Sequence, residues 1–299
     1  MRPSYPLDDE LARQSALYGK VVFLVATPET GAEVLARALG EFPTVAALPV
    51  QTALFSHGMY RLLDQWQHDP SDQGFHYLCS AQEFLLASRL LADAPLEAAL
   101  AAIGGDLVVE YSVDHIQNLD DIAVLYPDAT VVHVHRDGRV VADRLAKGQD
   151  AMAARYAARR WVDDQRTVWQ ALVDGTVRLE AVIADPAGSL SAFADVLGIE
   201  AEDAAVAAAV SHFDGAKHLL EDGPTGRAGA IVEIVAPEVL AHFGYEPNGT
   251  SRSARLAAWS EIALYGALAG ALDLRRRAQH KVAAKYGSEA WLPAGRPPT

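Results

Sequence analysis

Two short segments of the sequence combine residue types that could bind a phosphate or sulfate group. The first, Thr27–Glu33, follows an apolar, β-branched run and passes through Pro28 and Gly31 into a helical pattern. A tight turn that leads into a helix presents backbone N–H groups and the positive end of the helix dipole, which suits an anion. The segment lacks the Gly-Lys-Ser/Thr ending of a Walker A loop, so ordinary ATP or GTP hydrolysis is disfavoured.

The second segment, Arg136–Arg139, follows another apolar run, Ala129–His135. An arginine side chain can bind phosphate through two parallel hydrogen bonds. His133 and His135 share one face of the preceding run, but no third ligand stands at a recognisable spacing. A packed pair in the core is therefore favoured over a metal site.

Alternating strand and helix patterns must position these segments. Continuous apolar runs predict strands that are buried on both faces. They cover Lys20–Thr27, Val45–Leu48, Leu107–Tyr111, Ala129–His135 and Thr176–Ala184. Helical periodicity covers Ala32–Leu39, Ala81–Ile103, Leu119–Leu125, Ala151–Leu172 and Ser189–Leu197, with a further helix from Val140. This alternation indicates a mostly parallel sheet, whose ligands bind at the carboxyl ends of the strands.

Several stretches resemble, in order and spacing, the PAPS-dependent sulfotransferase family (bacterial type, with altered donor-binding motifs). Tyr126–Arg139 is similar to the family's Phe-Pro-Asp-Ala strand, which ends in Arg-Asp-Pro/Gly-Arg. Later stretches that resemble the family are Arg160-Trp161, Val177–Pro186, Phe193–Gly198 and Phe243–Pro247. The resemblance implies an α/β fold, a P-loop nucleoside-phosphate-type three-layer sandwich with a parallel sheet of about five strands.

The resemblance also divides the chain. We expect an N-terminal lead-in over residues 1–19, a sulfotransferase-like domain over residues 20–247, and a C-terminal helical extension and tail over residues 248–299.

The resemblance implies transfer of a sulfuryl group from 3′-phosphoadenosine 5′-phosphosulfate (PAPS) to a hydroxyl of a small metabolite or glycan. In the family, the first Arg of the Arg-Asp motif binds the 3′-phosphate of the donor, and Arg136 matches it. The family's donor loop, which holds the 5′-phosphosulfate, matches Thr27–Glu33. The residues expected to contact the donor are Pro28, Thr30, Gly31, Ala32, Glu33, Arg136 and Arg144. No metal is expected.

Three positions depart from the family's pattern. Glu29 replaces the Arg of the donor loop, and two like charges about 4 Å apart cost roughly 4 kcal/mol at an effective dielectric of 20. Tyr111 replaces the Lys of the family's Lys-Thr-Pro segment, whose hydroxyl position survives as Ser112. Arg144 replaces a Ser eight residues after the first Arg of the motif, and an Arg can itself bind phosphate.

The catalytic base is not identified. Sulfuryl transfer to a hydroxyl needs a His or a Glu that takes the proton of the acceptor. Many bacterial members place a Glu after the second strand, where this chain has Gln51, which is no base at neutral pH. His57, Asp114 and His115 lie nearby in the sequence, but no motif selects one of them.

Two functions therefore remain open. The chain is either an active sulfotransferase or a catalytically inactive sulfotransferase-fold protein that serves as a binding or interaction module. A third reading, a less anionic nucleotide or an acyl ligand, fits the same changes at the donor loop.

The composition of the chain limits the classes of molecule that it could bind. The formal net charge of −14 disfavours binding to nucleic acid, which requires clustered Lys and Arg. The apolar stretch Leu256–Leu274 contains charged residues and falls short of the about 20 residues that span a bilayer. A buried helix, or one that contacts a second copy or a protein partner, is expected there. The single Cys79 and the absence of a leader-like apolar segment predict a cytoplasmic protein.

Overall fold

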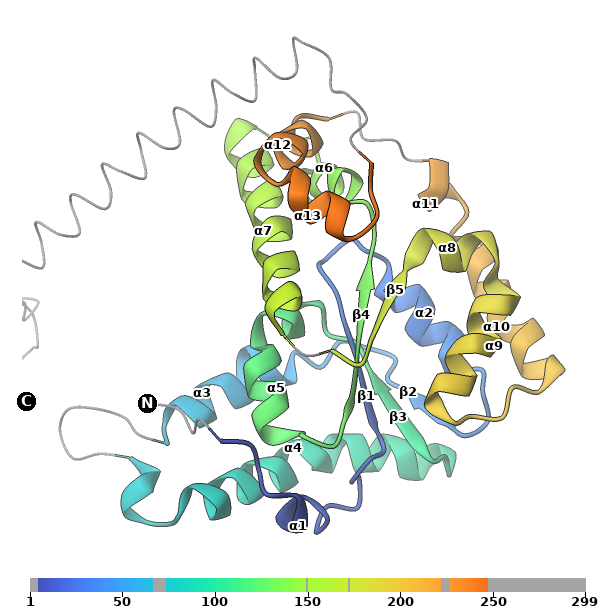
Figure 1. The fold of residues 1–299 in the computed structure, drawn as a ribbon. Helices are drawn as coiled ribbons and strands as arrows, with labels where there is room; N and C mark the ends of the chain where they lie inside the picture. The colour runs from blue at the N-terminus through green and yellow to red at the C-terminus, as the bar shows by residue number, and fades with distance from the viewer. Residues whose placement is uncertain (1–4, 67–73, 149, 172, 222–225, 247–299) are drawn as a thin grey trace, which may run out of the picture. The chain divides into compact units, whose positions relative to one another are not determined.

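The computed structural model describes residues 5–66, 74–148, 150–171, 173–221 and 226–246 (Figure 1). All of them belong to one compact unit, residues 1–247. The predicted helix over Leu256–Leu274 lies outside the described residues. No helix in the described ranges is long and apolar enough to cross a membrane.

A five-stranded parallel sheet forms the centre of this unit, as the sequence predicts. The strands are β1 (Val21–Val25), β2 (Val45–Ala47), β3 (Leu107–Glu110), β4 (Thr130–His135) and β5 (Gly175–Arg178). Their order across the sheet is β2-β3-β1-β4-β5, and every neighbouring pair is parallel. β1 lies in the middle of the sheet and all five of its residues are buried. Both of its faces are therefore covered, which explains why its sequence is continuously apolar.

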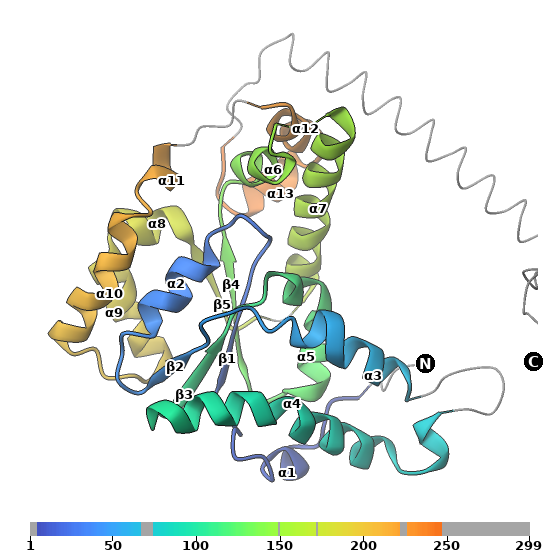
Figure 2. The ribbon, with the colours of Figure 1, turned by 180° about the vertical axis from the view of Figure 1, so that it is seen from behind.

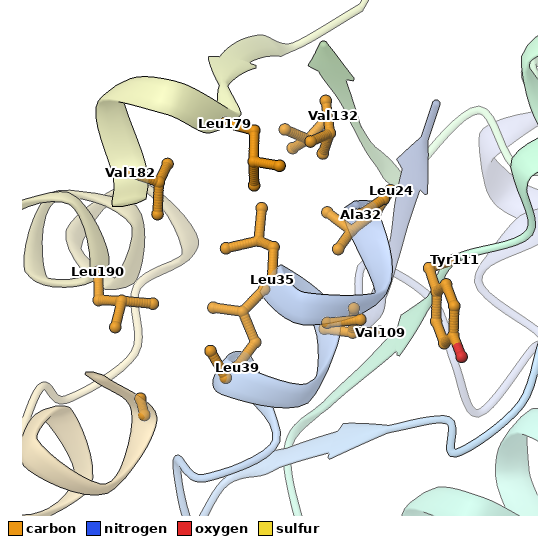
Figure 3. Close-up of a cluster of buried hydrophobic side chains, with 14 of the residues drawn as sticks. Leu24, Ala32, Leu35, Leu39, Val109, Tyr111, Val132, Leu179, Val182 and Leu190 are labelled. Atoms are coloured by element: carbon orange, nitrogen blue, oxygen red, sulfur yellow. The ribbon is translucent and has the colours of Figure 1, made fainter. Parts of the chain in front are cut away.

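Helices cover both faces of the sheet, which gives three layers (Figures 1 and 2). On one face lie α2 (Ala32–Leu39), α8 (Leu179–Ala184), α9 (Pro186–Leu197) and α10 (Asp203–Asp214). On the other lie α4 (Ala81–Ile103), α5 (Leu119–Leu125) and α7 (Ala151–Gln170). Figure 3 shows Leu35 of α2 beside Leu179 of α8, and Leu39 one turn further along α2, within one continuous hydrophobic cluster.

The remaining elements are short. They are α1 (Asp9–Ala12), η1 (Leu54–Met59), α3 (Tyr60–Asp64), η2 (Phe75–Tyr77), η3 (Val113–Asn118), α6 (Gly138–Ala146), α11 (His218–Glu221), α12 (Arg227–Val235) and α13 (Pro237–His242). Of these, α6, α11 and α12 lie beyond the arrowhead of β4, at the carboxyl edge of the sheet (Figure 1).

One predicted strand is wrong in its second half. We expect a strand over Thr176–Ala184, but β5 ends at Arg178 and the helix α8 follows at once. Leu179, Val182 and Ile183 are the buried residues of this stretch, and their spacing of three and four residues is that of a helix face. The apolar run therefore packs as a helix into the hydrophobic cluster that it shares with α2, not as a longer edge strand.

The two histidines of β4 form a packed pair in the core. His133 and His135 are buried, and their rings stack with centroids 5.5 Å apart. Phe243 contacts both rings, and the Tyr245 hydroxyl lies 3.0 Å from His135 Nδ1. Burial lowers the pKa of His133 to about 3 and that of His135 to about 4, so both are neutral at pH 7.

A buried arginine of α4 lies at the amino ends of the strands, here called the amino edge of the sheet. The Arg89 guanidinium contacts the carboxylates of Asp93 at 3.1 Å and Asp128 at 2.7 Å, and it lies 3.8 Å from the centroid of the Tyr126 ring. The Ser15 hydroxyl of the lead-in donates to Asp93 at 2.6 Å. These contacts connect the lead-in, α4 and the loop before β4.

Candidate functional site

The turn after β1 is shaped by its backbone. Thr30 N–H donates to Thr27 O at 3.2 Å, and Pro28 occupies the second position of this four-residue turn. Glu29 occupies the third position with φ 66°, in the left-handed region that type II turns normally fill with Gly or Asn. Gly31 follows with φ 99° and begins α2 as its N-cap. A Cβ on Gly31 would lie 2.7 Å from Leu179 Cδ2, so only glycine fits there.

The side chains of this turn differ in burial and in the contacts that they make. The Thr30 hydroxyl is buried and donates to Thr27 O at 2.6 Å, which stabilises the turn. Ala32 is the first residue of α2 and is buried, and the exposed Glu33 pairs with Arg37 one turn along that helix. Pro28 and Glu29 are half-buried. Of the residues expected to contact the donor, the turn therefore offers chiefly backbone groups.

Arg136 reaches the same place from β4. Its side chain is buried, and Nη2 donates to the carbonyl of Leu219 in α11. A Cβ on Gly31 would lie 3.5 Å from Leu219 Cδ1, so Leu219 adjoins both the turn and the arginine. The fold thus brings together the two segments that the sequence marks as anion-binding, with α11 beside them.

The rest of the Arg-Asp-Gly-Arg segment is structural. Asp137 caps α6 by accepting from Arg139 N–H at 2.9 Å, and its own N–H donates to Glu180 Oε1 at 2.8 Å. Arg139 forms two further hydrogen bonds with Asp137, which raise the pKa of its guanidinium. A Cβ on Gly138 would lie 2.2 Å from the Trp161 ring, so glycine allows α6 to pack on α7.

Arg144 and Glu29 face each other across the site. The Arg144 Nε donates to Glu29 Oε2 at 3.4 Å, and the two side chains are 34% and 32% exposed. One residue replaces a family Ser on α6 and the other replaces the family Arg of the donor loop. The two departures from the family's pattern are therefore in contact, and a cation still stands beside the loop.

Tyr111 stands where the family has a Lys, but its side chain cannot take over the role of that Lys. Its side chain is 3% exposed and belongs to the hydrophobic cluster beside α2 (Figure 3). Burial raises the pKa of its hydroxyl, which stays protonated at neutral pH.

A buried polar cluster around Glu110 was not anticipated from the sequence. Glu110 ends β3 with its carboxylate fully buried, and it accepts from the hydroxyls of Thr52 at 2.7 Å and Ser112 at 2.5 Å. His115 Nδ1 lies 2.8 Å from Glu110 Oε2. Burial alone raises the pKa of Glu110, but His115, Ser112 and Thr52 outweigh it and lower the pKa. A charged residue at the end of an apolar strand, followed by Ser and His, is the signal that could have revealed it.

This cluster decides which candidate bases an acceptor can reach. His115 is fully buried between Glu110 and the rings of Phe23 and Phe55, so it cannot take a proton from a substrate. Gln51 accepts from Val113 N–H at 3.4 Å.

Two of the candidate bases are accessible. The side chain of Asp114 is 39% exposed and pairs with Arg160 at 2.9 Å. His57 is exposed and lies 3.3 Å from the Ser56 hydroxyl. Among the described residues, no group of three or more His, Cys, Asp or Glu side chains could hold a metal ion.

Comparisons with known proteins agree on one family. A family model described as "Sulfotransferase family" matches residues 22–203, well over half of the chain. No curated protein matches the sequence.

One solved structure supports the same fold, and a second superposes less closely. The sulfotransferase domain from the curacin biosynthetic pathway is 16% identical and superposes with a TM-score of 0.50, covering 78% of this chain and 99% of that domain. A sulfotransferase from Mycobacterium avium is 14% identical with a TM-score of 0.47, covering 81% of each chain. The family match over more than half of the chain shows that this chain belongs to the sulfotransferase family.

Proposed function

We propose that this protein transfers a sulfuryl group from PAPS to a hydroxyl of a small metabolite or glycan. The observation that carries the proposal is the position of Arg144. The donor loop has lost its own arginine, yet the guanidinium of Arg144 lies 3.4 Å from the loop residue that replaced it. A cation beside the α2 N-terminus is what an anionic donor requires.

The residues present fit such a donor in two places. Backbone N–H groups from Gly31 onward at the start of α2 suit one anionic end, because the Thr30 N–H already donates to Thr27 O. Arg136 and Arg144, eight residues apart around α6, suit a phosphate at the other end. The donor supplies the sulfuryl group, and the protein orients it and keeps water away. Asp114 and His57 are the accessible candidates for taking the proton of the acceptor.

The first experiment is a calorimetric titration with adenosine 3′,5′-bisphosphate, the desulfated form of the donor. We expect micromolar binding that weakens at least tenfold in Arg144→Gln, because the Arg144 side chain is one-third exposed and can be replaced without emptying the core. A ligand at 100 times Kd stabilises the fold by about 2.7 kcal/mol, so the melting temperature gives an independent reading.

The alternative is a catalytically inactive binding module, which the carboxylate of Glu29 at the donor loop favours. Absence of binding at millimolar ligand would rule out the enzyme and leave the binding module. If binding is found, release of adenosine 3′,5′-bisphosphate from PAPS in the presence of hydroxylated metabolites tests transfer directly.

A further inference from the structure

The donor-loop turn holds Glu29 in a backbone conformation that suits another residue better. Its φ of 66° lies in the left-handed region, which glycine adopts freely and a residue with a Cβ does not. Nothing in the hydrogen bonding of the turn requires a glutamate, because the bond from Thr30 N–H to Thr27 O uses backbone atoms only. The reason for a carboxylate at this position must therefore lie in what its side chain contacts.

The side chain contacts Arg144, and the contact is of a breakable kind. The distance of 3.4 Å is long for a charge-assisted hydrogen bond, which typically measures about 2.7–2.9 Å. Both side chains are about one-third exposed, at 34% and 32%, so water can solvate either one after separation. By contrast, the neighbouring Arg139 is 3% exposed and bonds Asp137 at 2.8 Å.

Arg144 is also the cation that an incoming phosphate would use. It lies on α6 beside the donor loop, whereas Arg136 is buried and donates to Leu219 O. Glu29 and a bound phosphate would therefore be two anions with one shared partner.

We propose that Glu29 is an internal competitor of the donor, a specificity-determining carboxylate that holds Arg144 until the phosphate of the nucleotide displaces it. This inference rests on the proposed function, because it assumes that a phosphorylated nucleotide binds here. Glu29 thereby weakens the binding of any anion that cannot bind both the loop and Arg144. A nucleotide with phosphates at both ends can make both contacts, whereas a lone small anion cannot.

The test is a calorimetric titration of the full chain with adenosine 3′,5′-bisphosphate, in wild type and in Glu29→Gln. The substitution removes the charge and keeps the size of the side chain. We expect Kd to fall at least about fivefold, equivalent to about 1 kcal/mol. Glu238→Gln is the matched control, because it removes a carboxylate that pairs with Arg166 at 3.0 Å on α7, and it should leave Kd within about twofold.

A double-mutant cycle distinguishes competition from simple repulsion. If Glu29 acts by holding Arg144, Glu29→Gln should tighten binding much less in the Arg144→Gln background than in wild type. If the carboxylate only repels the ligand, the gain should be equal in both backgrounds, and the competition mechanism is wrong. Melting curves of each variant without ligand verify that it is folded.

The remaining outcomes separate the inference from the proposed function. If wild type binds and Glu29→Gln changes Kd by less than fivefold or weakens binding, the inference fails and the nucleotide site stands. If wild type and all variants fail to bind at millimolar ligand, the proposed function fails and the inference fails with it.

Discussion

Arginines at the two ends of the strands of the parallel sheet differ in how far they are buried. At the amino edge, Arg89 is fully enclosed, contacts the carboxylates of Asp93 and Asp128 and donates to Leu125 O at 3.1 Å. At the carboxyl edge, Arg144 has one-third of its side chain in solvent and lies 3.4 Å from Glu29. The buried contacts of Arg89 cannot exchange with water or with a ligand. The Arg144 guanidinium is solvated in part, so it can exchange Glu29 for another anion.

This difference follows from what each edge must do. A buried charge is tolerated only when its hydrogen bonds are complete, so the Arg89 cluster is rigid. The proposed nucleotide site would need an ion pair that can open when a ligand arrives, and the exposed Arg144–Glu29 pair meets that condition. The two arginines therefore differ in exposure and in contact distance, not in residue type.

The largest expected effect is at the amino edge. Arg89→Met would leave Asp93 and Asp128 buried without their cation, and we expect the free energy of unfolding to fall by about 3–5 kcal/mol. Arg144→Met, the same change at the carboxyl edge, should cost less than about 1 kcal/mol. Equilibrium urea unfolding measures both. Equal losses in the free energy of unfolding would show that Arg89 and Arg144 contribute alike to stability.

Acid should destabilise the strand that leads to the carboxyl edge. Burial lowers the pKa of His133 to about 3 and of His135 to about 4, against 6.5 for an ordinary histidine. Neither ring nitrogen of His133 has a hydrogen-bond partner among the described residues. Below pH 6.5 these histidines therefore bind protons in the unfolded chain and not in the folded one. Their contribution to the free energy of unfolding is fully present above pH 6.5 and is lost as the pH falls.

The expected slope is about 1.4 kcal/mol per pH unit for each of these histidines. His133→Leu should therefore lose about 2 kcal/mol less stability than wild type between pH 6.5 and pH 5. Urea unfolding at the two pH values measures the difference. Identical losses in the two proteins would mean that His133 is protonated in the folded state.

The smallest expected effect concerns the donor-loop turn. Glu29→Gly removes the cost of a left-handed non-glycine residue, about 1 kcal/mol, while losing an ion pair of smaller value. We expect a gain in the free energy of unfolding of up to about 1 kcal/mol. Glu29→Ala, which keeps a Cβ and loses the pair, should show no gain. If both variants are equally stable, the turn is not strained by its side chain.

Local pattern was enough to predict most of the sheet and its helices. The apolar runs of β1 and β4 are continuous because both faces of those strands are covered, so burial alone identifies them. The same criterion failed at Leu179–Ala184, because a short apolar run satisfies a strand and a helix equally well. Only the packing of α8 into the shared hydrophobic cluster decided between them.

The sequence by itself determined the family, the parallel sheet and the two segments that meet at its carboxyl edge, since these depend on residue order and hydrophobic pattern. It could not show that Glu29 and Arg144, 115 positions apart, are in contact, or that Tyr111 packs in the core while His115 is sealed beside Glu110. Those facts depend on distances between distant parts of the chain, which only the tertiary structure sets. Two substitutions that look independently damaging in the sequence are, in the fold, an ion pair.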